Sequence, residues 1–133
     1  FDIKKFKYSN SVNFSAYHDG YKKFKEGIFH CRQWSVSNNS IKIVDNIIGK
    51  GVHKIRSVLP LHPSVSAGDV QEGSINLNIS GNIVKINFEG KGELKVIESQ
   101  YYPEFGCSVD NKHLVYDDYN GKLPSKITIR ISW

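Results

Sequence analysis

Apolar and polar residues alternate along most of this chain, and this alternation constrains the fold more than any other feature. Near the end of the chain, Ile127, Ile129, Ile131 and Trp133 alternate with Lys126, Thr128, Arg130 and Ser132. A period of two places all the apolar side chains on one face of a β-strand. The same period recurs over 75–79 and 84–88, whereas helical periodicity is almost absent. The pattern predicts half-buried strands of antiparallel sheets.

Turn-forming residues divide the chain into short segments. We expect a hairpin over 74–89 that turns at Ser80-Gly81-Asn82, further turns at Asn38-Asn39, 47–51, 90–92 and Asn120-Gly121, and a loop over 61–73. The remaining strands are expected at about 12–18, 27–36, 40–46, 52–60, 93–100, 112–117 and at the C-terminus. This spacing favours an all-β fold: an antiparallel two-sheet β-sandwich of about nine to eleven short strands, with a closed barrel or jelly roll as the alternative.

Composition excludes several classes of protein. The chain has 133 residues, 39% apolar and 23% charged, which indicates one globular domain over 1–133. No apolar run approaches the roughly 20 residues of a membrane-spanning helix. Two cysteines exclude a disulfide scaffold and a four-thiolate zinc site. Cys31 is expected to be a buried thiol on the face opposite Arg32, Cys107 lies in a loop, and both are expected to be free.

The charge is positive, at a formal +5, so nucleic acid and acidic polysaccharide are both candidate partners. Only three of the 18 basic residues are arginines, and most of the lysines are scattered. Because recognition of bases and phosphates favours the planar fork of arginine, we expect no nucleic-acid partner.

No arrangement of residues in the sequence identifies a catalytic site. There is no phosphate-binding loop and no serine nucleophile elbow, and the carboxylates are scattered. His18-Asp19 suits two metal ligands or an acid–base pair, but it fits better a strand end followed by a turn. We therefore predict no catalytic residue and no metal ligand in this chain.

Two groups of residues are candidates for contact with a glycan. On one strand face, Arg32 and Trp34 lie with His30, and together they suit a sugar ring and its carboxylate; packing of Trp34 between the sheets is the favoured alternative. The second group, Tyr101 and Tyr102, begins the densest aromatic stretch of the chain. Exposure of that stretch as a binding edge and burial at one end of a sandwich are equally consistent with the sequence.

Several short motifs, in this order, resemble one family. They are His18-Asp19-Gly20-Tyr21, His30-Cys31-Arg32-Gln33-Trp34, Ile41-Lys42-Ile43-Val44-Asp45, Gly49-Lys50-Gly51-Val52-His53, Leu59-Pro60-Leu61-His62-Pro63, Tyr101-Tyr102-Pro103-Glu104-Phe105-Gly106 and Leu123-Pro124. Together they resemble the C-terminal β-sandwich of heparinase II/III-like proteins, over nearly the whole chain. That family includes heparin, heparan and alginate lyases.

The resemblance implies a larger parent protein. The lack of methionine and the abrupt start at Phe1-Asp2-Ile3 likewise predict that the chain is a piece of something longer. The parent would join this sandwich to an N-terminal helical α/α-toroid. It would cleave anionic, uronic-acid-containing polysaccharide by β-elimination, using a tyrosine and an asparagine or histidine of the toroid and a histidine of the β-region. Zinc is implied for some parents.

For this chain the resemblance implies a role without a catalytic site. It would be inactive alone, would complete the fold and would help to wall the substrate cleft, with His18, Asp19, Gly20 and Tyr21 as a structural motif. It would need no cofactor of its own. A bacterial periplasmic, cell-envelope or secreted location follows.

Two other functions stay open at this stage. One is an autonomous carbohydrate-binding module, and the other is a structural or assembly domain of a polysaccharide system in the cell envelope. An oligonucleotide-binding barrel is a more distant alternative, because arginine is scarce.

Overall fold

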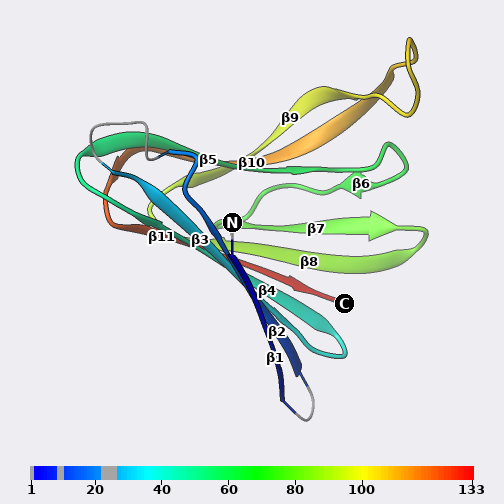
Figure 1. The fold of residues 1–133 in the computed structure, drawn as a ribbon. Coiled ribbons are helices and arrows are strands. Elements are labelled where there is room, and N and C mark those ends of the chain that lie inside the picture. Colours follow the sequence, from blue (N-terminus) through cyan, green and yellow to red (C-terminus); the bar gives the residue numbers. More distant parts are fainter. Residues whose placement is uncertain (1, 9–10, 22–26) are drawn as a thin grey trace.

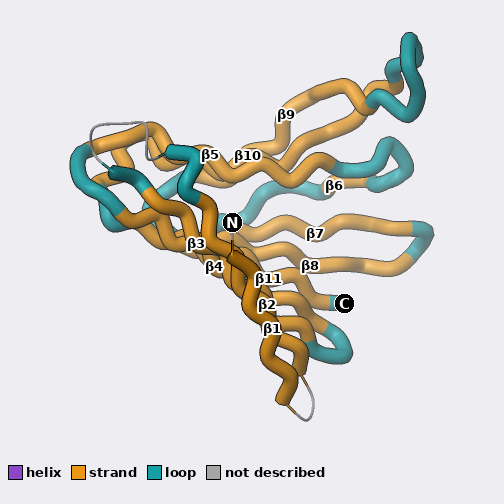
Figure 2. Tube along the Cα trace, in the orientation of Figure 1, coloured by secondary structure: helices purple, strands orange, loops and turns teal. Residues whose placement is uncertain are grey.

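The computed structural model describes residues 2–8, 11–21 and 27–133, and its regular structure there consists entirely of β-strands (Figures 1 and 2). The strands are β1 (Asp2–Tyr8), β2 (Ser11–His18), β3 (Phe29–Val36), β4 (Ser40–Ile48), β5 (Val52–Pro60), β6 (Ser66–Ala67), β7 (Ser74–Ile79), β8 (Asn82–Glu89), β9 (Glu93–Tyr101), β10 (Val109–Lys122) and β11 (Ser125–Ser132). Within these ranges no helix is long and apolar enough to cross a membrane.

The strands form two antiparallel sheets of unequal size. The large sheet has eight strands in the order β1-β2-β3-β4-β11-β8-β7-β6, and the small sheet has three in the order β5-β10-β9. Figure 1 shows the small sheet above the large one, with the two layers diverging toward the β9–β10 tip. The predicted antiparallel two-sheet sandwich is therefore confirmed.

The core lies between the small sheet and the middle of the large one. Its least exposed large side chains are Ile75, Leu114 and Ile129, which come from β7, β10 and β11. Among the residues whose burial is described, this core cluster includes none from β2 or β3; from β3, Trp34 packs against it while partly exposed. The large sheet therefore extends beyond the cover of the small one, and its inner face opens at β3 and β4.

Most of the predicted turns agree with the structure. Ser80 and Gly81 have φ angles of 51° and 88°, and the pair of positive values is typical of a tight hairpin turn between β7 and β8. Asn38-Asn39 joins β3 to β4, and residues 49–51 join β4 to β5.

Two details of the predicted strand pattern were wrong. Asn120-Gly121 is not the turn before the last strand, because β10 continues to Lys122 and the pairing with β5 shifts register between Asp118 and Gly121. That shift is a β-bulge, which uses the same residue types as a turn. The predicted loop over 61–73 contains the two-residue strand β6, which pairs with β7.

Removal of buried side-chain volume at Ile129 tests the position of the core. We expect Ile129→Ala to lower the free energy of unfolding by about 3–4 kcal/mol, because Ile129 is fully buried and the substitution leaves a cavity. Urea denaturation monitored by tryptophan fluorescence measures the loss. Ile83→Ala is the matched control, because Ile83 is 57% exposed, and a loss of less than about 1 kcal/mol is expected. Equal losses in the two variants would contradict this position of the core.

Candidate functional site

A buried carboxylate interrupts the apolar inner face of the large sheet. On β4, Asp45 follows Ile41 and Ile43 in the inward-facing phase and is 3% exposed. Its neighbours on β3 are Arg32, directly across the strand pair, and His30. Asp45 Oδ1 lies 2.6 Å from both His30 Nε2 and Arg32 Nε, and Asp45 Oδ2 lies 2.8 Å from Arg32 Nη2. The carboxylate therefore joins β3 to β4 by side-chain bonds in addition to the backbone ladder.

The electrostatics of this group keep Asp45 ionised. Burial raises the pKa of Asp45, but hydrogen bonds from His30 and Arg32, together with their charges, more than offset that effect and hold the pKa below its ordinary value. The hydrogen bond to Asp45 raises the pKa of the Arg32 guanidinium. Because the ionised carboxylate accepts from His30 Nε2, the second ring nitrogen, Nδ1, is the one left to bind another group.

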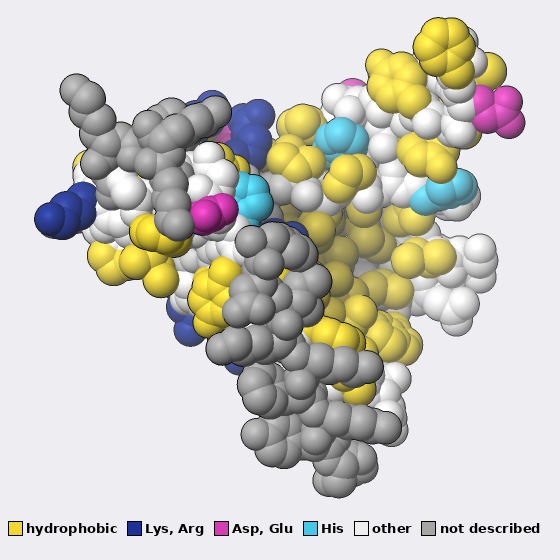
Figure 3. Space-filling model, in the orientation of Figure 1, with side chains coloured by type: hydrophobic (Ala, Val, Ile, Leu, Met, Phe, Trp, Pro, Cys, Tyr) yellow, Lys and Arg dark blue, Asp and Glu magenta, His cyan; other side chains and the backbone are white. Residues whose placement is uncertain are grey.

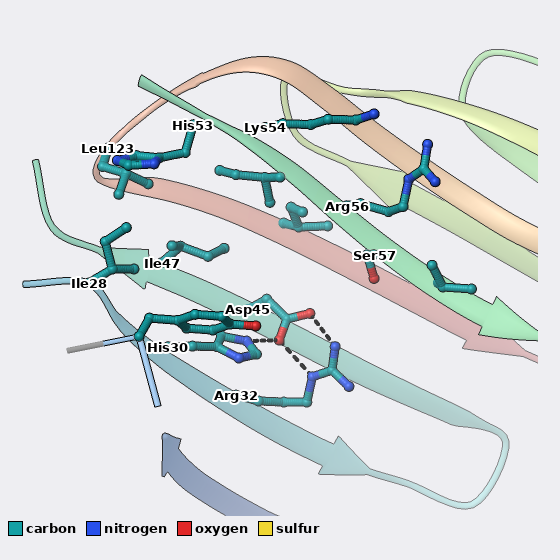
Figure 4. A pocket seen from close by; sticks show the side chains of 14 residues that line it. Ile28, His30, Arg32, Asp45, Ile47, His53, Lys54, Arg56, Ser57 and Leu123 are labelled. Atoms are coloured by element: carbon teal, nitrogen blue, oxygen red, sulfur yellow. Dashed lines mark hydrogen bonds and ion pairs between the residues drawn. The ribbon is translucent and has the colours of Figure 1, made fainter. Parts of the chain in front are cut away.

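This group lies at one side of an open cleft of about 530 Å³ between β3–β4 and β5 (Figure 4). The lining residues are Tyr21, Ile28, His30, Arg32, Asp45, Ile47, His53, Lys54, Ile55, Arg56, Ser57, Val58, Leu123 and Ile127. Three of them carry a permanent positive charge and one carries a negative charge. Arg32 is paired with Asp45 within the cleft, whereas Lys54 and Arg56 lie on the opposite phase of β5 from Ser57 and stand at the rim (Figure 4).

A second ion pair lies on the outer face of the small sheet. Arg56 donates to Asp117 through Nε at 2.6 Å and through Nη2 at 2.7 Å. This bidentate bond lowers the pKa of Asp117 to about 2; burial opposes the shift, and a hydrogen bond from Tyr119 adds to it. Nearby, the ammonium groups of Lys54 and Lys95 lie 5.2 and 5.7 Å from the centre of the Tyr119 ring. Figure 3 shows Lys and Arg side chains gathered over this part of β5 and β10.

The four predicted glycan contacts are not brought together. Arg32 and Trp34 are neighbours on β3, with the guanidinium 5.9 Å from the centre of the Trp34 ring. Arg32 is held by Asp45, and Trp34 packs against the core while partly exposed. Tyr101 ends β9 in the other sheet, and the loop after it projects away from β3 (Figure 1).

The aromatic stretch after β9 is exposed. Tyr102 is 70% exposed and the Phe105 side chain is fully exposed, while the Tyr101 ring lies 5.5 Å from the His62 ring. Of the two arrangements that the sequence left open, the structure has the exposed edge.

His18 ends β2, and Asp19, Gly20 and Tyr21 follow it into a turn. His18 Nδ1 accepts the backbone N–H of Gly20 at 3.1 Å, and the His18 and Tyr21 ring centres lie 5.2 Å apart. Tyr21 also lines the cleft. The structural role assigned to this segment stays a prediction.

Both cysteines are free, as expected, with Cys31 buried and Cys107 exposed. In the described part of the chain, no three His, Cys, Asp or Glu side chains are grouped so that they could hold a metal ion. At the cleft, Arg32 engages both oxygens of the Asp45 carboxylate. The described residues at the cleft therefore do not fit the zinc ion that the resemblance implied for some parents.

Sequence reasoning missed the centre of this site. Asp45 counted there as the end of one family-like motif and as one of the scattered carboxylates, but its place in the apolar phase of its own strand was not used. A charged residue in such a phase must be paired when buried, and this signal points to Asp45 directly.

Comparison with known proteins gives a family and a fold. The family described as "Heparinase II/III-like, C-terminal" matches residues 2–130. No curated protein matches the sequence significantly. Similar solved structures include the heparan sulfate lyase HepC from Pedobacter heparinus, at 11% identity and a TM-score of 0.79, and a structure described as heparinase III, at 14% identity and a TM-score of 0.78. Each alignment covers 98% of this chain and 21% of the solved one, so the chain spans about a fifth of these proteins.

The buried carboxylate should be important for stability. We expect Asp45→Asn to lower the free energy of unfolding by about 2–3 kcal/mol, because Arg32 and His30 would lose their charged partner in a site that is only partly open to water. Chemical denaturation measures the loss. The control is Glu93→Gln, which breaks the ion pair between Glu93 and Lys95. Because both of these side chains are exposed, we expect a loss below about 0.5 kcal/mol. A loss no larger than that of the control would contradict the role assigned to Asp45.

Stability should also fall in acid. The folded-state pKa values of Asp45 and Asp117 lie below the ordinary value of about 3.9 for an unfolded Asp. Both groups therefore stabilise the fold above about pH 4, and their contribution is lost as the pH falls toward 2. The free energy of unfolding, measured across this range, should fall less steeply for Asp117→Asn than for the unchanged protein. Parallel curves would contradict the assignment.

Proposed function

The chain belongs to the family of heparinase II/III-like C-terminal domains. On this basis we propose that it is the non-catalytic β-sandwich portion of a polysaccharide lyase. In this proposal the full-length parent cleaves a uronic-acid-containing polysaccharide by β-elimination. The sandwich completes the fold of the parent and forms one wall of its substrate cleft. Its partners are the anionic polysaccharide and an N-terminal helical toroid, and its location is the bacterial periplasm, the cell envelope or outside the cell.

The cations at the cleft carry this proposal. Arg32 lines the cleft beside Asp45, and Lys54 and Arg56 stand at its rim on β5, where Arg56 is paired with Asp117. A uronic-acid polymer presents one carboxylate per uronate ring, and cations set among apolar residues suit such a ligand in both charge and stacking surface.

The chemistry of β-elimination explains why this wall matters. A base removes the proton beside the uronate carboxylate, and the negative charge that develops on that group must be stabilised. The cleft of this chain supplies cations, together with a histidine, His30, whose orientation is fixed by Asp45. The base that removes the proton and the acid that assists departure of the leaving sugar are assigned to the toroid.

A second function is favoured by one observation, the exposed aromatic loop at Tyr101, Tyr102 and Phe105. Exposed rings stack on sugars, so this loop would suit an autonomous carbohydrate-binding module. The two functions differ in where a glycan binds. The lyase wall uses the cleft beside β5, and the module uses the tip beyond β9.

Formation of the unsaturated uronate product tests the proposed role. The chain and its full-length parent would each be incubated with heparin, heparan sulfate, alginate and hyaluronan, and the ultraviolet absorbance of the product would be followed. We expect product from the parent on at least one polymer and none from the chain alone. Product from the chain alone would contradict the non-catalytic role and would make His18, His30 and His53 catalytic candidates.

A substitution in the parent tests the cationic wall. We expect Lys54→Gln to lower kcat/KM by about threefold to tenfold, because Lys54 is an exposed cation at the rim of the cleft, and such a cation contributes about 1 kcal/mol to binding of an anion. The matched control is Lys85→Gln, which removes an exposed lysine of β8 that does not line the cleft. Equal kcat/KM values for the two variants would show that the cleft does not contact the substrate.

A further inference from the structure

One buried hydroxyl in the cleft has no hydrogen-bond partner. Ser57 is 8% exposed, and its Oγ makes no hydrogen bond to any described residue. A hydroxyl removed from water without a new partner destabilises the fold, so such groups are uncommon and call for an explanation.

Ser57 differs from the other buried side chains that have a polar atom without a hydrogen-bond partner. In the described part of the chain, Asn111 Oδ1 and Asp118 Oδ2 also lack a partner. However, Asn111 donates through Nδ2 to the carbonyl of Leu61, and Asp118 Oδ1 accepts the backbone N–H of Asn120. Of the three, Ser57 alone lines the cleft and leaves its only polar side-chain atom unbonded.

The hydroxyl faces a guanidinium that has donors to spare. Ser57 lies on the inward phase of β5 and points into the cleft, and Arg32 enters the same cleft from β3 (Figure 4). Arg32 donates to Asp45 from Nε and Nη2, so the N–H groups of Nη1 are not used in that pair. The side chain of Arg32 is 33% exposed, which leaves it accessible from the cleft.

We propose that Ser57 and Arg32 form a subsite that binds one anionic oxygen group of the polysaccharide, with one donor from each sheet. The ligand group is a uronate carboxylate or a sulfate ester, since both present several acceptor oxygens. Arg32 supplies the charge, and the Ser57 hydroxyl supplies a directional donor. This inference rests on the proposed function only for the class of ligand.

Removal of the Ser57 hydroxyl should have different effects if the group binds ligand and if it only stabilises the fold. If the hydroxyl acts only when ligand is bound, its removal should stabilise the free protein and weaken binding. If it were bonded within the fold, its removal should destabilise the free protein. Melting temperature and affinity, measured on the same variants, separate the two roles.

The experiment uses a heparan sulfate tetrasaccharide as the probe. Its dissociation constant would be measured by isothermal titration calorimetry for the unchanged chain, for Ser57→Ala and for the control Ser132→Ala, an exposed serine of β11 outside the cleft. We expect Ser57→Ala to bind about five- to tenfold more weakly, as for loss of one hydrogen bond to a charged group, and to melt at an equal or higher temperature. Ser132→Ala should match the unchanged chain in affinity.

Two modified probes identify the acidic group. One is the same tetrasaccharide with its carboxylates reduced to alcohols, and the other is the desulfated tetrasaccharide. The probe that lacks the group held at Ser57 should bind the unchanged chain and Ser57→Ala with equal affinity.

Each remaining outcome counts against a defined claim. Binding by the unchanged chain that Ser57→Ala leaves within twofold would overturn the subsite but not the proposed function. A clear fall in the melting temperature of Ser57→Ala would also overturn the subsite, because the hydroxyl would then be bonded within the fold. No binding of any probe by the unchanged chain would count against contact between the cleft and glycan, and so against both.

Discussion

The unequal size of the two sheets is the constraint on which the rest of this structure depends. A three-stranded sheet covers only the middle of an eight-stranded one, so part of the inner face of the large sheet has no opposing layer. An uncovered inner face cannot stay wholly apolar without exposing hydrophobic surface to water. In this chain the transition occurs at β3 and β4, where Asp45, Arg32 and His30 replace the apolar residues of the inner face.

The same constraint explains why the cleft is polar on both sides. Because β5 is an edge strand, Ser57 on its inner face lines the cleft, and Lys54 and Arg56 on its outer face stand at the rim. Ionised Asp45 fixes His30 and Arg32 in place, and this order is a useful property in a binding wall, because ligand does not have to immobilise those side chains. The edge of the core and the proposed glycan wall are therefore formed by the same residues.

The sequence predicts the strands well and the site poorly, and the reason is physical. Alternation is a local property, so the strands of the 74–89 hairpin and the C-terminal strand could be identified from their own residues. The pairing of Arg32 with Asp45 depends on the register between β3 and β4, which local patterns do not fix. Placement of Ser57 opposite Arg32 depends further on how two sheets pack. Asn120-Gly121 is a local pattern with two possible outcomes. The same residues suit a turn or a β-bulge, and only the pairing with β5 decides between them.

Nuclear magnetic resonance mapping can show whether a glycan binds in the cleft. The isotopically labelled chain would be titrated with a uronic-acid oligosaccharide, and the backbone amide shifts would be followed residue by residue. We expect the largest changes on β3, β4 and β5, around His30, Asp45 and Ser57. Changes confined to the loop beyond β9, around Tyr102 and Phe105, would contradict this expectation and would identify the chain as a binding module that uses its aromatic tip.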